Sequence, residues 1–466
     1  MKTIVMKFGG TSVENAERIL NSAKIVAHEA RQNRVVVVAS ALAGVTDEIL
    51  KCTNAAARAD EPTLRECLET IRTRHEAMVA ELFSQPQREK VLQGIQAILQ
   101  RLHDFCFALL QLRAITPQLL DVSLGMGEKM SNQIFAALLQ QLGFTSMYVD
   151  SVDVLVTDDR FGDATADLEA TRLRAEEILV PHLKNNYIPV VTGYAGATPK
   201  GQPTTLGRGG SDSSATIIGS VLNCDEIWIW TDVDGVLTAD PRLGVKARIL
   251  PEITYAEAIE LSYYGAKVIH HKAIRPAMDK NIPVWIKNSF KPKVAGTKIT
   301  AHASTMQGPI KGVSAITKAS LITLAVRDDI YGAADILGRL FLRLGHDHVD
   351  VLFSTQSSAE NAFGLVLRAE DTDRVRSFIE RIFRTELKHG VLKSVKVEKD
   401  LAVIAILGEA MKGSYGIIAR LFAAVARCKV SVIAVAQGAT ELSICFAVQA
   451  SSASEVIRAI HKEFLE

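Results

Sequence analysis

The sequence predicts an α/β protein in which a mostly parallel sheet lies between helices and is followed by two smaller α+β modules of the βαββαβ type. Three observations lead to this prediction. Short β-branched runs alternate with helical patterns through roughly the first 300 of the 466 residues. Near Thr300 that alternation stops. The remaining residues contain an internal repeat, which is typical of a duplicated structural unit.

The first two pairs of strand and helix share one design. In "TIVMKFGGTS", residues 4–8 form an apolar strand pattern that two glycines end before a helical pattern begins. In "RVVVVASALAGVTDEIL", residues 35–38 are a β-branched run, residues 40–44 are a turn of small residues, and a helix is expected to begin near Thr46. Apolar strands that alternate with helices are typical of a parallel sheet covered on both faces.

A long helical insertion follows these pairs. Apolar residues keep helical spacing over residues 64–82 and again over residues 91–109, with few loop signals between them. Strand patterns then resume at residues 146–149, 188–192, 227–230 and 283–286. Each of these strands has a turn or a charged loop near its end. In open α/β sheets, ligands bind at the carboxyl ends of the strands.

The tail repeats itself with an offset of 81 positions, since "RLF" at Arg339 matches "RLF" at Arg420. The other matches in this register are Gly332 with Gly413, Val349 with Val430, Val351 with Val432, and Gln356 with Gln437. Each copy shows a strand, a glycine-containing turn, a helix and two strands, which is the start of a βαββαβ unit. The predicted division is a large α/β domain at residues 1–300 and modules at residues 301–392 and 393–466.

Sheet edges in such small modules must be covered, so we expect pairing between the copies or between subunits. The protein is therefore expected to be a homo-oligomer, either a homodimer or a homotetramer.

Composition favours a small ligand over nucleic acid or a membrane. Lysine and arginine number 53, aspartate and glutamate number 52, and the net charge is +1, so no surplus of charge would attract such partners. No apolar run approaches the roughly 20 residues that span a bilayer, and the start "MKTIVMKF" has no cleavage site. We therefore expect a cytoplasmic protein.

Six cysteines without a C-x-x-C pair predict reduced thiols and no metal site. The adjacent His270 and His271 are not expected to bind a metal together either, because neighbouring side chains on a helix or strand point in different directions.

The stretch "GRGGSDSSAT" at residues 207–216 predicts a ligand-binding loop at the start of a helix. Its three glycines allow close approach and a positive φ, and the free N–H groups of a helix start favour anions. An ordinary helix cap after a tight turn would explain the glycines and serines. It would not explain both Arg208 and Asp212.

Known nucleotide-binding motifs are absent or incomplete. The P-loop pattern is absent, no H-R-D or D-F-G set is present, and "GMGEKM" has Met130 where G-x-G-x-x-G needs its last glycine. What remains is a series of glycine-rich turns that carry Lys7, Glu128, Arg208 with Asp212, and Lys267. Each lysine by itself is equally explained as a solvated side chain.

These residue types would suit phosphoryl transfer if the turns converge, because its transition state is served by cations and positioning more than by an acid or base. Asp212 could orient a lysine. Arg208 offers two parallel donors to a substrate carboxylate, and Glu128 could meet an ammonium group.

Six motifs stand in the order and approximate spacing of the aspartate kinase signatures of the amino acid kinase family: "KFGGTS", "SALAGVT", "GMGEKMS", "LGRGGSDSSA", "TDVDGVLTADPR" and "YGAKVIHHKAI". The tail resembles that family's paired ACT domains, so the likeness covers essentially the whole chain. It implies the amino acid kinase fold and transfer of the γ-phosphate of ATP to the β-carboxylate of L-aspartate. The products would be ADP and 4-phospho-L-aspartate, in the first step toward lysine, threonine and methionine, with Mg²⁺ carried on the phosphates.

The resemblance also implies roles for single residues. Lys7 and Lys267 would stabilise the transferring phosphoryl group, and Asp212 would hold the lysines. ATP would contact Lys7, Gly9, Gly10, Gly209, Gly210, Thr231, Asp232, Leu237, Arg242 and Lys267. Aspartate would contact Ser40, Thr46, Glu128, Arg208 and Ser211. Leu237 stands where many members carry tyrosine, and the usual "HP" after the second lysine is "HH" here, which is expected to alter a turn.

Two other functions stay open. A glutamate or acetylglutamate kinase would share the phosphate apparatus, but it is not expected to combine "GMGEKMS" with a doubled ACT tail. A non-catalytic amino-acid sensor should have lost a lysine or Asp212, and both lysines and Asp212 are present. No dehydrogenase segment follows Glu466, so we expect a monofunctional enzyme.

An amino-acid effector is expected at the ACT tail, but its identity is open between lysine, threonine, both and none. Asp350 and Gln356 in the first copy are the candidate contacts. Gln356 and Ser357 stand where the family usually has serine and glutamate, which puts inherited inhibition in question.

Overall fold

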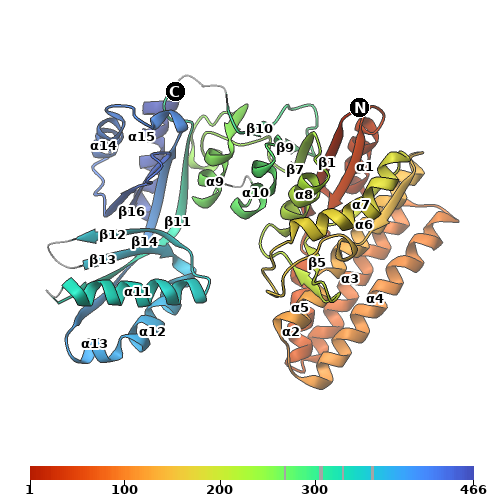
Figure 1. Cartoon of the computed structure of the whole chain (residues 1–466), viewed down its shortest axis with the longest axis horizontal. Coiled ribbons are helices and arrows are strands. Elements are labelled where there is room, and N and C mark those ends of the chain that lie inside the picture. The colour runs from red at the N-terminus through yellow and green to blue at the C-terminus, as the bar shows by residue number, and fades with distance from the viewer. Residues whose placement is uncertain (267–268, 304–307, 328–329, 358–361) are drawn as a thin grey trace. The chain divides into compact units, whose positions relative to one another are not determined.

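The structure is a computed structural model that describes residues 1–266, 269–303, 308–327, 330–357 and 362–466 (Figure 1). The chain divides into two compact units. The first comprises Met1–Val236, Pro251–Tyr255 and Ile269–Ala303, and the second comprises Leu237–Leu250, residues 256–266 and the described residues from 308 onward. Within the described ranges, no helix is both long enough and apolar enough to cross a membrane.

The described residues of the first unit form an eight-stranded sheet with the order β3-β4-β2-β1-β7-β9-β10-β8. Its strands are β1 (Thr3–Phe8), β2 (Arg34–Ala39), β3 (Ser146–Val149), β4 (Ile188–Thr192), β7 (Glu226–Thr231), β8 (Glu252–Thr254), β9 (Val284–Asn288) and β10 (Thr297–Thr300). Neighbouring strands are parallel except β9 and β10. The mostly parallel sheet expected from the β-branched runs is therefore confirmed.

Helices cover both faces of this sheet, as its apolar strands require. One face packs against α1 (Ala16–Glu29) and α6 (Met126–Gln141), in a core that includes Met6 and Phe8 of β1. The other face contacts α8 (Gly210–Val221). Helix α8 in turn contacts α7 (Leu168–Lys184) and α10 (His271–Asp279). Because side chains alternate along a strand, Lys7 points to the face opposite Met6 and Phe8, which is the face of α8.

The helix expected near Thr46 is confirmed by α2 (Val45–Ala57), and the helical insertion is confirmed by α3 (Glu61–Leu82) and α4 (Gln87–Leu112), which α5 (Pro117–Leu124) follows. The two long helices α3 and α4 lie side by side and extend away from the sheet (Figure 1). Their apolar faces join the core of the first unit through buried residues such as Leu64, Ile71 and Leu102. A short antiparallel hairpin of β5 (Ala195–Ala197) and β6 (Pro203–Thr205) precedes α8.

The described residues of the second unit contain a six-stranded antiparallel sheet with the order β12-β13-β11-β14-β16-β15. Its strands are β11 (Gly312–Val326), β12 (Val351–Ser357), β13 (Ala362–Arg368), β14 (Leu392–Leu407), β15 (Ala434–Gln437) and β16 (Ser443–Gln449). The helices of this unit are α11 (Ile330–His346), α12 (Thr372–Ile382), α13 (Arg384–Lys388), α14 (Ile417–Arg427) and α15 (Ala453–Leu465). Helix α9 (Tyr255–Tyr263) also belongs to this unit, except for its first residue.

The repeat predicted from the sequence reappears in the elements at the same offset. Strand β13 begins at Ala362 and β16 at Ser443, and helix α12 begins at Thr372 and α15 at Ala453. Each copy therefore contributes two long helices at matching positions, α11 and α12 in the first and α14 and α15 in the second.

Two hydrophobic cores lie under the helices of the two copies. One includes Ile322 of β11 with Leu340 and Phe378, and the other includes Val313 of β11 with Leu421. The long strand β11 therefore takes part in both cores. The domain boundaries at residues 300/301 and 392/393 stay predictions.

Candidate active site

A buried lysine and an aspartate meet where β1 ends and α8 begins. Lys7 is 9% exposed, and its Nζ lies 2.5 Å from Oδ1 of Asp212. The alternation along β1 directs Lys7 toward α8, and Asp212 occupies the first turn of that helix. A carboxylate is favourable at a helix N-terminus, where the unpaired N–H groups carry positive partial charge. The structure thus joins two of the predicted site residues in one ion pair.

Glu128 lies in the first turn of α6 and is 3% exposed. Burial raises the pKa of its carboxyl group to about 7, while hydrogen bonds from backbone N–H groups and the nearby charge of Lys7 act to lower it. Among the residues that the structure describes, Oε2 of Glu128 has no hydrogen-bond partner. A buried carboxylate with an unused oxygen beside a lysine can accept a cationic group from a ligand.

Helix α6 also holds the end of β2 in place. The Ser131 hydroxyl donates to the carbonyl of Ser40 (2.7 Å), and the Asn132 side-chain amide donates to the carbonyls of Ala39 (2.9 Å) and Glu128 (2.7 Å). Ser40 therefore lies beside the helix that carries Glu128. The sequence prediction did not include Asn132, and its only signal was its position directly after "GMGEKMS".

The loops after β1 and β2 approach each other through glycine. A Cβ at Gly10 would lie 3.2 Å from the carbonyl oxygen of Ala41 and 3.3 Å from Cα of Ala43. Thr46 follows this second loop, in the first turn of α2. The N–H of Gly9 donates to the carbonyl of Trp230 (3.2 Å), so the loop after β1 is tied to the end of β7.

Gly209 is the N-terminal cap of α8 and has a φ of +74°. A Cβ there would lie 2.6 Å from Cβ of His270, so the loop that carries Arg208 and Asp212 packs directly on this histidine. The pKa of His270 is lowered by burial and by the positive charges of His271, Lys272 and Arg208, while Asp212 acts in the opposite direction.

The position of His270 against this loop was not predicted from the sequence. Its Nδ1 is buried and has no partner within the described part of the chain. The signal available in the sequence was its place three residues after Lys267 in "GAKVIHH".

Other predicted site residues surround this centre. Arg208 is exposed, Gly210 begins α8 with its N–H donated to the carbonyl of Gly207 (3.0 Å), and Ser211 packs against Gly193. Thr231 ends β7 beside β1, and its hydroxyl donates to Oδ1 of the exposed Asp232 (3.1 Å).

Three of the predicted ATP-binding residues are not part of this described centre. Lys267 falls outside the described residues. Leu237 and Arg242 belong to the second unit, where Leu237 forms a β-bridge with Ile249 and the exposed Arg242 pairs with Asp240 at 2.6 Å.

Asp350 and Gln356 lie in the second unit at and beside the edge strand β12. Asp350 is exposed and directly precedes β12, and Gln356 pairs with Phe363 of β13. Although β12 and β15 are at opposite ends of the strand order, the two strands contact each other. The part of Asp350 and Gln356 in effector binding stays a prediction.

Comparison with known proteins agrees with the geometry of this centre. The model of the amino acid kinase family matches residues 2–288, and a model of the ACT domain matches residues 404–464. The chain belongs to the amino acid kinase family.

Within that family, the chain is similar along its whole length to aspartokinases. It is 32% identical to chloroplastic aspartokinase 2 of Arabidopsis thaliana, covering 100% of this chain and 84% of the relative. It is 29% identical to the bifunctional aspartokinase/homoserine dehydrogenase of Haemophilus influenzae, covering 98% of this chain and 56% of that relative. The chain thus spans about half the length of the bifunctional relatives that it matches.

Solved structures give the same relationship. The complex of E. coli aspartokinase III with aspartate and ADP matches with a TM-score of 0.82 at 30% identity, and both chains are covered completely. The complex of that enzyme with lysine and aspartate matches with a TM-score of 0.81, also at 30% identity and with both chains covered completely.

Proposed function

We propose that this protein is an aspartate kinase that transfers the γ-phosphate of ATP to the β-carboxylate of L-aspartate, giving ADP and 4-phospho-L-aspartate. This is the first step toward lysine, threonine and methionine. One observation carries the proposal most directly: the Lys7–Asp212 pair lies beside a buried Glu128 carboxylate with an unused oxygen. Cationic and anionic groups at one sheet edge suit a substrate that brings both phosphate and ammonium groups.

On the phosphate side, Lys7 would neutralise charge that develops on the transferring group, and Asp212 would hold its Nζ at the end of β1. Lys267 would act with Lys7. The glycine-rich turns at Gly9, Gly10, Gly209 and Gly210 would let the nucleotide approach the backbone, and Thr231, Asp232, Leu237 and Arg242 would contact the rest of it. We propose that Mg²⁺ is bound through the phosphate oxygens, which are ligands of the kind it prefers.

On the aspartate side, Glu128 would accept a hydrogen bond from the substrate ammonium group. Arg208 would bind a substrate carboxylate with two parallel N–H donors. The hydroxyl groups of Ser40, Thr46 and Ser211 would complete the contacts. A neutral acid has no charge to offer an ammonium group, so Glu128 must be ionised for this role.

The tail is proposed to regulate the kinase. E. coli aspartokinase III, which this chain resembles at 30% identity, has been solved with lysine and aspartate. By analogy, an amino-acid effector would bind near Asp350 and Gln356. We further propose a catalytic domain at residues 1–300, ACT modules at 301–392 and 393–466, a homodimer or homotetramer, and a cytoplasmic location.

A substrate panel tests the proposed reaction. The purified protein is incubated with Mg²⁺-ATP and with L-aspartate, L-glutamate or N-acetyl-L-glutamate, and the acyl phosphate is trapped with hydroxylamine. We expect hydroxamate with L-aspartate only. A higher kcat/KM for either glutamate substrate would assign the protein to another branch of the family, and no turnover with any substrate would favour a non-catalytic sensor.

A further inference from the structure

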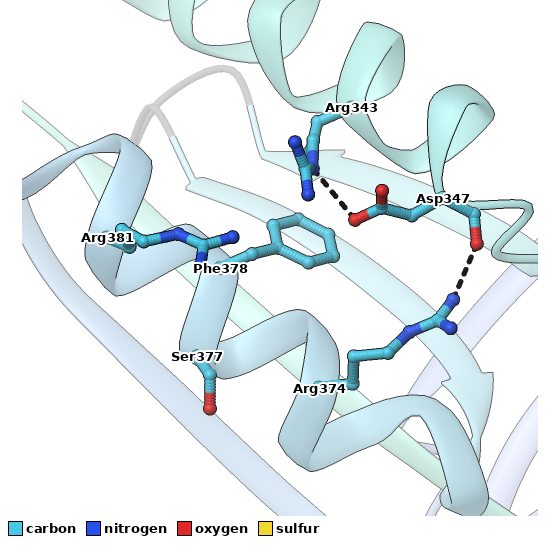
Figure 2. Close-up of a pocket in the computed structure, with 6 residues that line it drawn as sticks. All are labelled: Arg343, Asp347, Arg374, Ser377, Phe378 and Arg381. Carbon is cyan, nitrogen blue, oxygen red and sulfur yellow. Dashed lines mark hydrogen bonds and ion pairs between the residues drawn. The ribbon is translucent and has the colours of Figure 1, made fainter. Parts of the chain in front are cut away.

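A cavity of about 530 Å³ lies in the second unit between the end of α11 and one face of α12. Its lining residues, shown in Figure 2, are Arg343, Asp347, Arg374, Ser377, Phe378 and Arg381. Arg374, Ser377 with Phe378, and Arg381 follow the spacing of one helical face of α12. Arg343 and Asp347 come from the end of α11 and the residue after it. Two helices therefore contribute arginines to one hollow.

The charges in this cavity do not balance. Arg343 Nε donates to the Asp347 carboxylate at 2.7 Å, and an Nη of Arg374 donates to the Asp347 main-chain carbonyl, also at 2.7 Å (Figure 2). Arg374 also lies 3.8 Å from Asp371, which is outside the lining. Arg381 is exposed and has no hydrogen bond or ion pair to any residue that the structure describes. The lining thus has three guanidinium groups and one carboxylate.

Asp347 stays ionised in this setting. A hydrogen bond from His346 and the adjacent Arg343 hold the pKa of its carboxyl group below its usual value, against the effect of burial. It neutralises Arg343, and Asp371 lies beside Arg374. Arg381, which has no ion pair to a described residue, therefore leaves a positive surplus that attracts an anion.

The second copy of the repeat shows that the fold does not require these arginines. At the offset of 81 positions, Arg343 corresponds to Ala424, Asp347 to Cys428, Arg374 to Glu455, Ser377 to Arg458, Phe378 to Ala459 and Arg381 to Lys462. Burial raises the pKa of the Cys428 thiol there, and the charge of Glu455 adds to this effect while Arg427 and Arg458 act against it. Since Ala424 and Glu455 stand in the second copy where the first has Arg343 and Arg374, the repeat fold does not require those two arginines.

We propose that this cavity is a binding site for the phosphate group of a small phosphorylated molecule. A guanidinium group presents N–H donors in a planar fork that fits phosphate oxygens. Arg374 and Arg381 supply such forks from α12, and Arg343 supplies another from α11. The cavity exceeds the volume of a phosphate group, and the buried ring of Phe378 adds an apolar surface for the rest of the ligand.

Titration calorimetry of the full chain with inorganic pyrophosphate, without nucleotide or Mg²⁺, tests this site. The double variant Arg374→Gln/Arg381→Gln removes two exposed guanidinium groups. Arg376→Gln is the matched control, because Arg376 is an exposed arginine of the same helix outside the cavity and pairs with Glu380 at 2.8 Å. We expect the double variant to weaken pyrophosphate binding by at least about tenfold, since it removes the charge-assisted hydrogen bonds of two guanidinium groups. The control should bind as the wild type does.

A second variant keeps the arginines and adds a negative charge. Ser377 is exposed, so Ser377→Glu should fold normally and also weaken pyrophosphate binding. Thermal unfolding of each variant checks its fold. Equal binding by the wild type and the double variant would overturn the proposal, as would an equal loss in Arg376→Gln or no binding by the wild type. Succinate is the carboxylate probe, and equal binding of succinate would refute selectivity for phosphate.

Discussion

At the residue scale, the ion pair of the buried Lys7 with the half-buried Asp212 is the contact on which phosphoryl transfer should depend most. Its side chains are 11% and 17% exposed, so water screens their charges only in part. The short contact holds Nζ of Lys7 at the end of β1. A cation that is already in place needs no reorganisation when charge develops on a substrate.

Replacing Lys7 by methionine is expected to lower kcat by roughly 10²-fold or more, because one preorganised charge donor contributes about that much. The measurement is steady-state turnover of ATP with L-aspartate, combined with circular dichroism to confirm folding. Lys2→Met is the matched control, since Lys2 lies just before the same strand, is 58% exposed in its side chain and pairs with Glu226 away from Asp212. A folded Lys7→Met variant with near-normal kcat would show that Lys7 has a structural role and does not take part in phosphoryl transfer.

Glu128 gives the proposed reaction a pH dependence. Its pKa is raised to about 7 by burial, and only the ionised form can pair with the substrate ammonium group. We therefore expect kcat/KM for aspartate to fall as the pH drops below about 7. Glu128→Gln should raise the KM for aspartate and flatten this acid limb, while the KM for ATP changes little. An unchanged acid limb in the variant would mean that another group is responsible.

The same shift has a consequence for stability. Because the folded state raises the pKa of Glu128 from 4.5 to about 7, it binds the proton more tightly than the unfolded chain does. Its contribution to stability is present below about pH 4.5 and is lost as the pH rises through 7. Glutamine has no such loss, so the melting temperature of Glu128→Gln relative to wild type should rise between about pH 4.5 and 7. A constant difference across this range would contradict the burial of an ionisable group.

At the element scale, the loop before α8 depends on a residue without a side chain. Gly209 combines a positive φ with close packing on His270, so alanine there would meet both backbone strain and a clash. We expect Gly209→Ala to lower both the melting temperature and kcat. Gly143→Ala separates the two causes, because Gly143 has a φ of +88° with no atom within 4 Å of an added Cβ and should show the strain alone, about 1–2 kcal/mol.

The clash itself can be tested by making room for it. His270 precedes α10 as its N-terminal cap, a position where glycine is tolerated. The double variant Gly209→Ala/His270→Gly should recover part of the melting temperature lost in Gly209→Ala. No recovery would show that strain, and not the contact with His270, explains the loss.

Helix α9 is joined to the repeat by a buried ion pair within the second unit. Nζ of Lys311 lies 2.9 Å from Oε2 of Glu257, the side chains are 9% and 1% exposed, and Oε1 of Glu257 accepts the N–H of Glu409 at 2.9 Å. Lys311→Met would break this buried ion pair, which typically costs about 3–5 kcal/mol. We expect faster hydrogen–deuterium exchange in α9 and β11, and partial recovery in Lys311→Met/Glu257→Gln. Unchanged exchange would show that the pair is dispensable.

At the scale of the whole molecule, the duplicated tail is expected to act through a ligand that binds one arrangement of the protein better than another. Such coupling is typically about 1–3 kcal/mol, which corresponds to a change of about 5- to 150-fold in affinity. The exposed Asp350 precedes the edge strand β12, and β12 contacts its repeat counterpart β15. This is where an effector could bridge the two copies.

Asp350→Ala is expected to relieve inhibition by an amino acid of the aspartate pathway while leaving the uninhibited kcat within about twofold. Lysine, threonine and both together are titrated against the wild type and the variant, with the oligomeric state followed by light scattering. Flat curves for the wild type would mean that the effector pocket has been lost. The tail would then serve assembly alone.

Much of the architecture was predictable because local patterns and global fold agree. The β-branched runs at residues 35–38 and 188–192 became β2 and β4, and the helical spacing at 64–82 fell within α3. The repeat offset located matching elements in the tail. The part played by β11 in both cores of the tail was not predictable. A local pattern identifies a strand, but it does not indicate which distant helices each end of that strand will pack against.

The sequence by itself determined the fold class, the repeat, and the charged turns that carry Lys7, Glu128, Arg208 and Asp212, because periodicity and glycine placement are local properties. Only the tertiary structure decided that Lys7 and Asp212 form a pair, that one oxygen of Glu128 is left unused, and that His270 supports the glycine loop. These facts depend on distances between residues as far apart in the chain as Lys7 and Asp212. Packing of the sheet and its helices sets such distances, and no spacing along the chain encodes them.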